Sequence, residues 1–163
     1  MLGRLTAHGI DFVVIGGVAV VLLGSPRVTQ DLDICFATDR ENLEALGHAL
    51  VELEARLRSI DEEIPFVPDA RTLAGVELLT LSTSAGSLDV HVRPKGAPAY
   101  TTLRRRARRL NLEGFAVLVA SIEDMMAMKL EAGRTRDLAD LEELEAIRRL
   151  RKRVTPPEDA PDA

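Results

Sequence analysis

The chain has 163 residues, 46% of them apolar and 29% charged, which is the composition of a folded domain and excludes extensive disorder. Its net charge of −5 argues against a protein that coats nucleic acid non-specifically. No apolar run reaches the roughly 18 residues of a membrane span, and the single cysteine, Cys35, excludes an internal disulfide. We therefore expect a cytoplasmic protein without membrane contact.

The first part of the chain predicts strands that alternate with helices. Residues 11–15 are rich in β-branched side chains and end at a glycine pair, which is typical of a buried strand entering a tight turn. A short helix over 18–24 should follow, and then a strand over 31–36, where polar and apolar residues alternate. Leucines recur every three or four residues from 39 to about 59, which predicts an amphipathic helix.

The second part continues this alternation. The predicted elements are an irregular crossing at 60–75, strands at 76–81 and 87–92, a helix at 99–109, a strand at 115–119, and helices at 121–131 and 136–152. The whole pattern indicates an α+β (α/β) fold with a mixed sheet flanked by helices. We expect a core over 1–120, two C-terminal helices over 121–153 packed on that core, and a disordered tail over 154–163.

Two aspartates on the strand at 31–36 are the first indication of a functional site. Asp31 and Asp33 are two residues apart, so their side chains share one face of the strand. Carboxylates this close repel each other unless a cation lies between them or one pKa rises, and Mg²⁺ suits such oxygen ligands. Asp89 would become a third ligand if its strand pairs with this one, and three such carboxylates can hold two metal ions.

A glycine pair provides the second half of the expected site. Gly16 and Gly17 lie between a strand and a helix, where the backbone can approach a phosphate closely. Neither the pair nor an Asp-x-Asp motif is specific alone, but their order is distinctive: Gly16-Gly17, a short helix, Gly24, Arg27, Thr29 and then Asp31-x-Asp33. The segment from Ile15 to Ile34 resembles the signature of the nucleotidyltransferase superfamily related to DNA polymerase β. It is most similar to the small bacterial branch of AbiEii-type toxins and minimal nucleotidyltransferases.

A second block further along the chain resembles the same branch. Lys129, Arg134, Asp137 and Asp140 follow its pattern Lys…Arg-x-x-Asp-x-x-Asp. In that family the lysine contacts the nucleotide phosphates, and a carboxylate of the block supports catalysis. The spacing agrees, because the two cations flank a predicted helix break and the two aspartates share one helical face.

The resemblance covers roughly residues 8–145 and implies a nucleotidyltransferase fold and activity. The enzyme would use Mg²⁺ or Mn²⁺ to move an NMP group from an NTP to a hydroxyl of a protein or of an RNA such as tRNA. The family further implies a toxin with a cognate antitoxin as partner. The implied catalytic residues are Asp31, Asp33, Asp89, Lys129, Asp137 and Asp140; the metal ligands are Asp31, Asp33 and Asp89; and the nucleotide-binding residues are Gly16, Gly17, Arg27, Thr29, Lys129 and Arg134.

Plainer explanations remain open for several of these features. Asp137 and Asp140 could cap a helix and form salt bridges, and Lys129 could be an ordinary surface lysine. The arginine clusters at 104–109 and 148–153 could bind phosphates or form solvated helix faces. The alternative function is a nucleotide-binding or regulatory module with the same fold and little turnover.

His91 shares the face of Asp89 and could point toward the site, whereas Cys35 is better explained as a small buried residue than as a nucleophile. The short chain also lacks the large C-terminal helical domain of longer relatives, which leaves the acceptor open.

Overall fold

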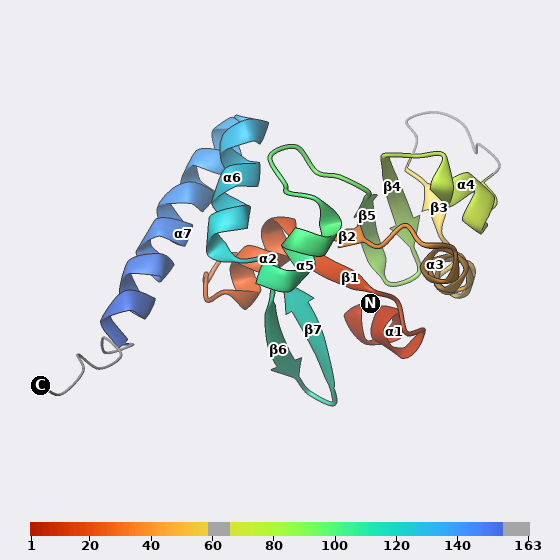
Figure 1. The fold of residues 1–163 in the computed structure, drawn as a ribbon, viewed down its shortest axis with the longest axis horizontal. Helices are drawn as coiled ribbons and strands as arrows, with labels where there is room; N and C mark the ends of the chain where they lie inside the picture. Colours follow the sequence, from red (N-terminus) through yellow and green to blue (C-terminus); the bar gives the residue numbers. More distant parts are fainter. Residues whose placement is uncertain (59–65, 155–163) are drawn as a thin grey trace, which may run out of the picture.

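The computed structural model describes residues 1–58 and 66–154, which form a seven-stranded sheet with helices around it (Figure 1). The strand order is β3-β4-β5-β2-β1-β7-β6. The strands are β1 (Phe12–Ile15), β2 (Asp31–Phe36), β3 (Arg56–Leu57), β4 (Leu78–Thr83), β5 (Gly86–His91), β6 (Arg108–Leu112) and β7 (Phe115–Val119). The pairs β2–β5 and β1–β7 are parallel and the other four are antiparallel, so the predicted mixed sheet is confirmed.

Helices surround this sheet. They are α1 (Leu2–Ala7), α2 (Gly16–Leu22), α3 (Arg40–Glu52), α4 (Ala70–Ala74), α5 (Tyr100–Arg106), α6 (Ile122–Ala132) and α7 (Thr135–Val154). Figure 1 shows α6 and α7 side by side at one end of the molecule, and α3 and α4 beside the edge strand β3 at the other. Among the described residues, no helix is long and apolar enough to cross a bilayer.

The core lies along the central strands. All four residues of β1 are buried, as expected for a strand with a neighbour on each side and apolar residues throughout. On β2, Leu32 and Ile34 are buried while Asp31 is exposed, which is the alternation that the sequence predicts. Leu144 of α7 belongs to the same buried cluster, so the last helix packs on the core through at least one fully buried side chain.

The predicted helix from 39 to about 59 ends too late. The helix α3 stops at Glu52, and Glu54 adopts a left-handed conformation with φ of 53°. The leucine spacing continues past this break because Leu53 is buried at the helix end, whereas Leu57 packs against the core from the short strand β3. Leucine periodicity alone could not distinguish a continued helix from a turn and an edge strand.

The predicted helix at 99–109 is also wrong over its last three residues. The helix α5 ends at Arg106, and residues 108–112 form β6, which pairs antiparallel with β7. Leu110 and Leu112 alternate with exposed residues along this strand, but arginines favour helices and hid the alternation. A short helix, α4, also forms within the segment expected to be irregular, where the Asp69 side chain caps it by accepting from the Thr72 amide.

Other boundaries differ slightly. The helix α2 begins at Gly16 rather than at 18, and β4 lies two residues later than the strand predicted at 76–81. The hairpin between β4 and β5 is correspondingly tight: Ser84 and Ala85 form its turn, and β5 begins directly after them at Gly86, which has φ of 110°. Val154 ends α7, and the remainder of the expected tail, 155–163, lies outside the described residues.

Candidate active site

The pairing of β2 with β5 brings the three predicted carboxylates together. In the parallel register, Asp33 lies opposite Asp89 and Asp31 lies opposite Ser87. All three aspartates therefore share one face of two adjacent strands. The Asp33 and Asp89 side chains are mostly covered, with 25% and 18% of their surface exposed, whereas that of Asp31 is half exposed. The strand pairing on which the role of Asp89 depended is therefore present.

Two further side chains contact these carboxylates. The Arg58 guanidinium donates from Nη2 to Asp89 Oδ1 at 2.7 Å, and its Nη1 lies 3.5 Å from Asp31 Oδ1. The His91 Nε2 lies 3.3 Å from Asp33 Oδ1, which agrees with the expectation from its strand face. The sequence placed Arg58 in the overlong helix and so gave no sign of its position.

The position of Arg58 follows from the strand register. The Arg58 backbone N–H donates to the Thr80 carbonyl at 2.9 Å, just beyond β3. Thr80 lies opposite Asp89 in the β4–β5 pair, so the hydrogen bond places the arginine one strand away from that carboxylate. Only tertiary strand order provides this information.

The environment of Asp89 raises the pKa of its carboxyl. Burial is the largest cause, and the negative charges of Asp33 and Asp31 act in the same direction. The positive charge of Arg58 opposes this effect without cancelling it. The site thus has an excess of negative charge, which is the condition under which carboxylates attract a further cation or a proton.

The glycine turn lies directly against this carboxylate group. Gly16 has φ of 66°, and a Cβ at this position would lie 2.1 Å from Asp33 Oδ2. A Cβ at Gly17 would lie 2.6 Å from Thr29 Oγ1 and 3.7 Å from Arg27 Nη2. Glycine is therefore required at both positions for space, and at Gly16 also for backbone conformation.

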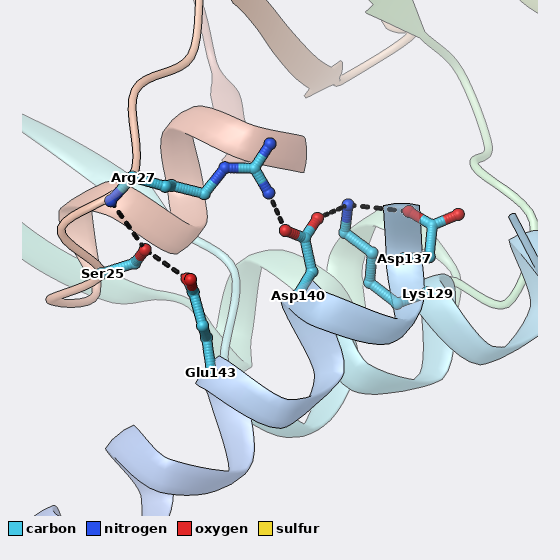
Figure 2. A network of polar contacts seen from close by, with 6 residues as sticks. All are labelled: Ser25, Arg27, Lys129, Asp137, Asp140 and Glu143. Atoms are coloured by element: carbon cyan, nitrogen blue, oxygen red, sulfur yellow. Dashed lines mark hydrogen bonds and ion pairs between the residues drawn. The ribbon is translucent and has the colours of Figure 1, made fainter. Parts of the chain in front are cut away.

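A polar network joins the loop before β2 to the two C-terminal helices (Figure 2). The Lys129 ammonium on α6 donates to Asp137 Oδ1 at 3.0 Å and to Asp140 Oδ2, both on α7. The other oxygen of Asp140 forms an ion pair with Arg27. The Ser25 hydroxyl in the same loop donates to Glu143. Arg27 thereby connects the glycine turn with the second motif.

The carboxylates of this network are buried. Asp137 and Asp140 are each 3% exposed, and such groups require charged partners or hydrogen bonds. Burial alone would raise the pKa of Asp137, but the hydrogen bond and charge of Lys129, together with the backbone N–H and charge of Arg134, outweigh it and hold the pKa below its ordinary value. The salt-bridging interpretation of these two aspartates is therefore correct in geometry, and a catalytic role for them stays a prediction.

Arg134 lies differently from the other three residues of its motif. Arg134 is exposed, and its backbone N–H donates to Asp137 Oδ2 at 3.2 Å. It follows Gly133, which ends α6 in a left-handed conformation with φ of 62°. The predicted helix break is confirmed, and a phosphate contact by the Arg134 side chain stays a prediction.

A family model for the nucleotidyl transferase AbiEii toxin of type IV toxin–antitoxin systems matches residues 2–155, which is nearly the whole chain. The chain belongs to this family. It is accordingly a nucleotidyltransferase, which confirms the resemblance inferred from the two motifs. No curated protein sequence matches it.

Solved structures share the fold of this AbiEii-family nucleotidyltransferase. The lincosamide antibiotic adenylyltransferase LnuA in its lincomycin-bound form is 19% identical, with a TM-score of 0.60, and the match covers 90% of this chain and 92% of that one. The structure of ANT(2'')-Ia in complex with adenylyl-2''-tobramycin is 16% identical, with a TM-score of 0.52, and the match covers 94% of each chain. At these identities the likeness establishes the nucleotidyltransferase fold.

The carboxylates of this AbiEii-family enzyme are oxygen donors of the kind that divalent cations prefer. Three aspartates share one face, the Gly16 turn leaves room for Asp33, and a cationic guanidinium already bridges Asp31 and Asp89. Over residues 1–58 and 66–154, no group of three or more histidine, cysteine, aspartate or glutamate side chains is arranged so that it could hold a metal ion. The three aspartates offer oxygen donors, but Arg58 contacts two of them in this arrangement, and a metal-binding role for them stays a prediction.

The remaining candidates are explained by packing. Cys35 is buried, its thiol donates to the Val92 carbonyl at 3.4 Å, and burial raises its pKa to about 12, which makes it unsuitable as a nucleophile. In the arginine clusters, four guanidiniums form ion pairs with carboxylates of the chain: Arg104 with Asp11, Arg106 with Asp124, and Arg148 and Arg149 with Glu145.

Proposed function

We propose that this protein transfers a nucleoside monophosphate from an NTP to an acceptor hydroxyl, using Asp31, Asp33 and Asp89 as its metal-binding and catalytic carboxylates. The β2–β5 register is the observation that supports this most directly, because it aligns Asp33 with Asp89 beside the Gly16 turn. A divalent cation, when bound to these oxygens, would neutralise charge on the phosphates and lower the barrier to their displacement.

The reaction requires a proton acceptor at the same site. The acceptor oxygen attacks the α-phosphorus, the new P–O bond forms, and the bond from that phosphorus to the β-phosphate oxygen breaks, releasing pyrophosphate. The hydroxyl proton moves to the Asp89 carboxylate. In the cation-free site burial raises the pKa of this carboxyl, and a carboxylate whose burial disfavours its charge takes up a proton more readily.

The triphosphate would be bound between the two motifs. The Gly16-Gly17 backbone lacks side chains that would keep a phosphate away, and Thr29 and Arg27 lie against Gly17. Lys129 uses two of its three N–H donors on Asp137 and Asp140, and Arg27 uses part of its five on Asp140. Both cations retain donors for phosphate oxygens, and the exposed Arg134 can add a third positive charge.

The proposed acceptor is an RNA end such as that of tRNA, or a protein hydroxyl. The family's description as toxins of type IV systems supports a toxin role and a cognate antitoxin protein as partner. LnuA and ANT(2'')-Ia carry antibiotic compounds in their structures, so small hydroxyl compounds belong in the set of acceptors to be tested.

Transfer can be tested with each of the four NTPs labelled in the α-phosphate, together with Mg²⁺ or Mn²⁺ and total RNA or total protein. We expect label to become covalently attached to one acceptor class, as shown by its sensitivity to ribonuclease or to protease. The double variant Asp31→Ala/Asp33→Ala serves as the control. Equal incorporation by the wild type and this variant would refute the assignment of the carboxylates.

A further inference from the structure

One side chain lies between carboxylates of two different strands in the site. The Arg58 guanidinium hydrogen-bonds Asp89 Oδ1 at 2.7 Å and lies 3.5 Å from Asp31 Oδ1. These are two of the three side chains that the proposed function assigns to a divalent cation. Arg58 thus occupies part of the same set of oxygens.

Electrostatics make joint occupancy unfavourable. A guanidinium at hydrogen-bonding distance and a divalent ion at coordination distance would both need the Asp89 carboxylate, and the two cations would repel each other at close range. The repulsion is weakly screened, because Asp89 is mostly covered. Either Arg58 or a divalent ion can therefore neutralise this carboxylate fully, but not both.

The fold allows Arg58 to leave at low cost. Its side chain is 37% exposed, and it follows the two-residue strand β3 at the edge of the sheet. The backbone stays tied to Thr80, while the long side chain can rotate into water without opening the core. Ion pairs of such partly exposed side chains contribute little free energy, so a divalent ion can displace this one.

We propose that Arg58 is an internal counter-cation that competes with the divalent metal ion for Asp31 and Asp89, so that metal binding requires Arg58 to leave. This inference rests on the proposed function for the identity of the metal ligands. Without metal, Arg58 offsets the repulsion among the three aspartates. With metal, the released guanidinium stands at the rim of the site.

The inference is tested by titrating the full chain with Mn²⁺ in the absence of nucleotide and acceptor. Binding is measured by calorimetry and by the paramagnetic resonance signal of free Mn²⁺. For Arg58→Gln we expect Mn²⁺ to bind about five-fold more tightly than to the wild type, the size expected when one partly exposed ion pair no longer competes. Arg58→Lys, which keeps the charge but loses the planar fork, should show a smaller gain in the same direction.

Arg40→Gln is the matched control, because it removes the same charge from an exposed ion pair with Glu44 on α3. Its Mn²⁺ affinity should equal that of the wild type. Asp89→Asn should bind Mn²⁺ more weakly in every background.

The outcomes separate the two hypotheses. Equal affinity in the wild type, Arg58→Gln and Arg58→Lys, with weaker binding to Asp89→Asn, would leave the metal site intact and overturn the competition. Mn²⁺ binding that is unaffected by Asp89→Asn, or absent from all variants at millimolar concentrations, would overturn the metal site and the competition together.

Discussion

At the scale of single residues, Gly16 carries the strictest requirement in the site. Its φ of 66° lies in the left-handed region, and the place of a Cβ is filled by the Asp33 carboxylate at 2.1 Å. Gly9 has nearly the same backbone conformation, with φ of 70°, but a Cβ there would meet nothing within 4 Å. Comparing an alanine substitution at each glycine therefore separates the cost of backbone strain, which both share, from the cost of displacing the Asp33 carboxylate, which only Gly16 has.

Gly16→Ala should therefore lower nucleotide transfer by about 100-fold, because a side chain that should be positioned to within an ångström is pushed aside. Gly9→Ala should reduce the free energy of unfolding by about 1 kcal/mol, because alanine disfavours the left-handed conformation, and it should leave the activity unchanged. Thermal unfolding and initial transfer rates measure the two effects. If Gly16→Ala were as active as Gly9→Ala, close contact between the turn and Asp33 would be unimportant.

At the scale of elements, the buried network of α6 and α7 determines how the second motif is held. Lys129 is the shared partner of Asp137 and Asp140, and Arg27 extends the network to the loop before β2. The pKa of Asp137 is lowered in the folded state because Lys129 and Arg134 together outweigh the effect of burial. Ionised Asp137 thus stabilises the fold at any pH above the ordinary carboxyl pKa. This stabilisation is lost as the pH falls through the lowered pKa of the folded state.

Asp137→Asn should reduce the free energy of unfolding by about 1–3 kcal/mol at about pH 7, since it leaves a largely buried ammonium with one carboxylate fewer. The difference from the wild type should shrink as the pH falls below about 4, because the Asp137 carboxyl of the unfolded wild type takes up a proton there while that of the folded protein is still ionised. Denaturant unfolding of both proteins at about pH 7 and below about pH 4 measures this difference in the free energy of unfolding. Glu131→Gln, on the exposed side of α6, is the control, and a pH-independent difference for Asp137→Asn would contradict the account.

The arginine-rich segment 104–109 also acts at the scale of elements. Arg106 donates to Asp124 at 3.0 Å, and that carboxylate is buried at the start of α6, where it also accepts from the Ser121 hydroxyl. Arg106 therefore ties the end of α5 to the helix that carries Lys129. A plain basic surface would not require this pairing.

Arg106→Ala should cost about 1–2 kcal/mol of stability, because a buried carboxylate loses a charged donor. The neighbouring Arg105→Ala, which removes an exposed arginine of the same cluster, should change stability by less than about 0.5 kcal/mol. Chemical denaturation distinguishes them. Equal effects would mean that the Arg106–Asp124 pair contributes no more than an exposed arginine.

At the scale of the whole molecule, the sequence predicts what depends on local pattern and misses what depends on strand order. The face shared by Asp31 and Asp33 and the helix break near Gly133 follow from alternation and capping signals, whereas the β2–β5 pairing was only a condition for the role of Asp89. Arg58 could not be predicted, because its place beside Asp89 depends on the edge strand β3 joining β4.

The same distinction explains the errors in secondary structure. The strand β6 and the end of α3 occupy sequences whose residues favour helix, and they are decided by pairing with β7 and β4. Spacing alone could not decide whether Lys129 is a surface lysine or pairs, as the structure shows, with two carboxylates of another helix. In each case tertiary contacts outweigh local preference.

The fold brings three separate parts of the chain to one site. The glycine turn after β1, the aspartates of β2 and β5, and the Lys129 network of α6 and α7 are connected through Asp33, Thr29 and Arg27. Their union is what the proposed transfer reaction needs: a phosphate-binding turn, a cation-binding carboxylate group and positive charges for the triphosphate.

The most direct test compares the wild type with Asp33→Asn in the covalent transfer of label from NTP carrying the label in either the α- or the γ-phosphate. We predict that only α-label is transferred, with one pyrophosphate released per transfer, and that Asp33→Asn reduces the rate by about 100-fold or more. Asp69→Asn, the same chemical change at the cap of α4, should retain full activity, because asparagine also caps helices. Transfer of γ-label, or full activity of Asp33→Asn, would contradict the central claim.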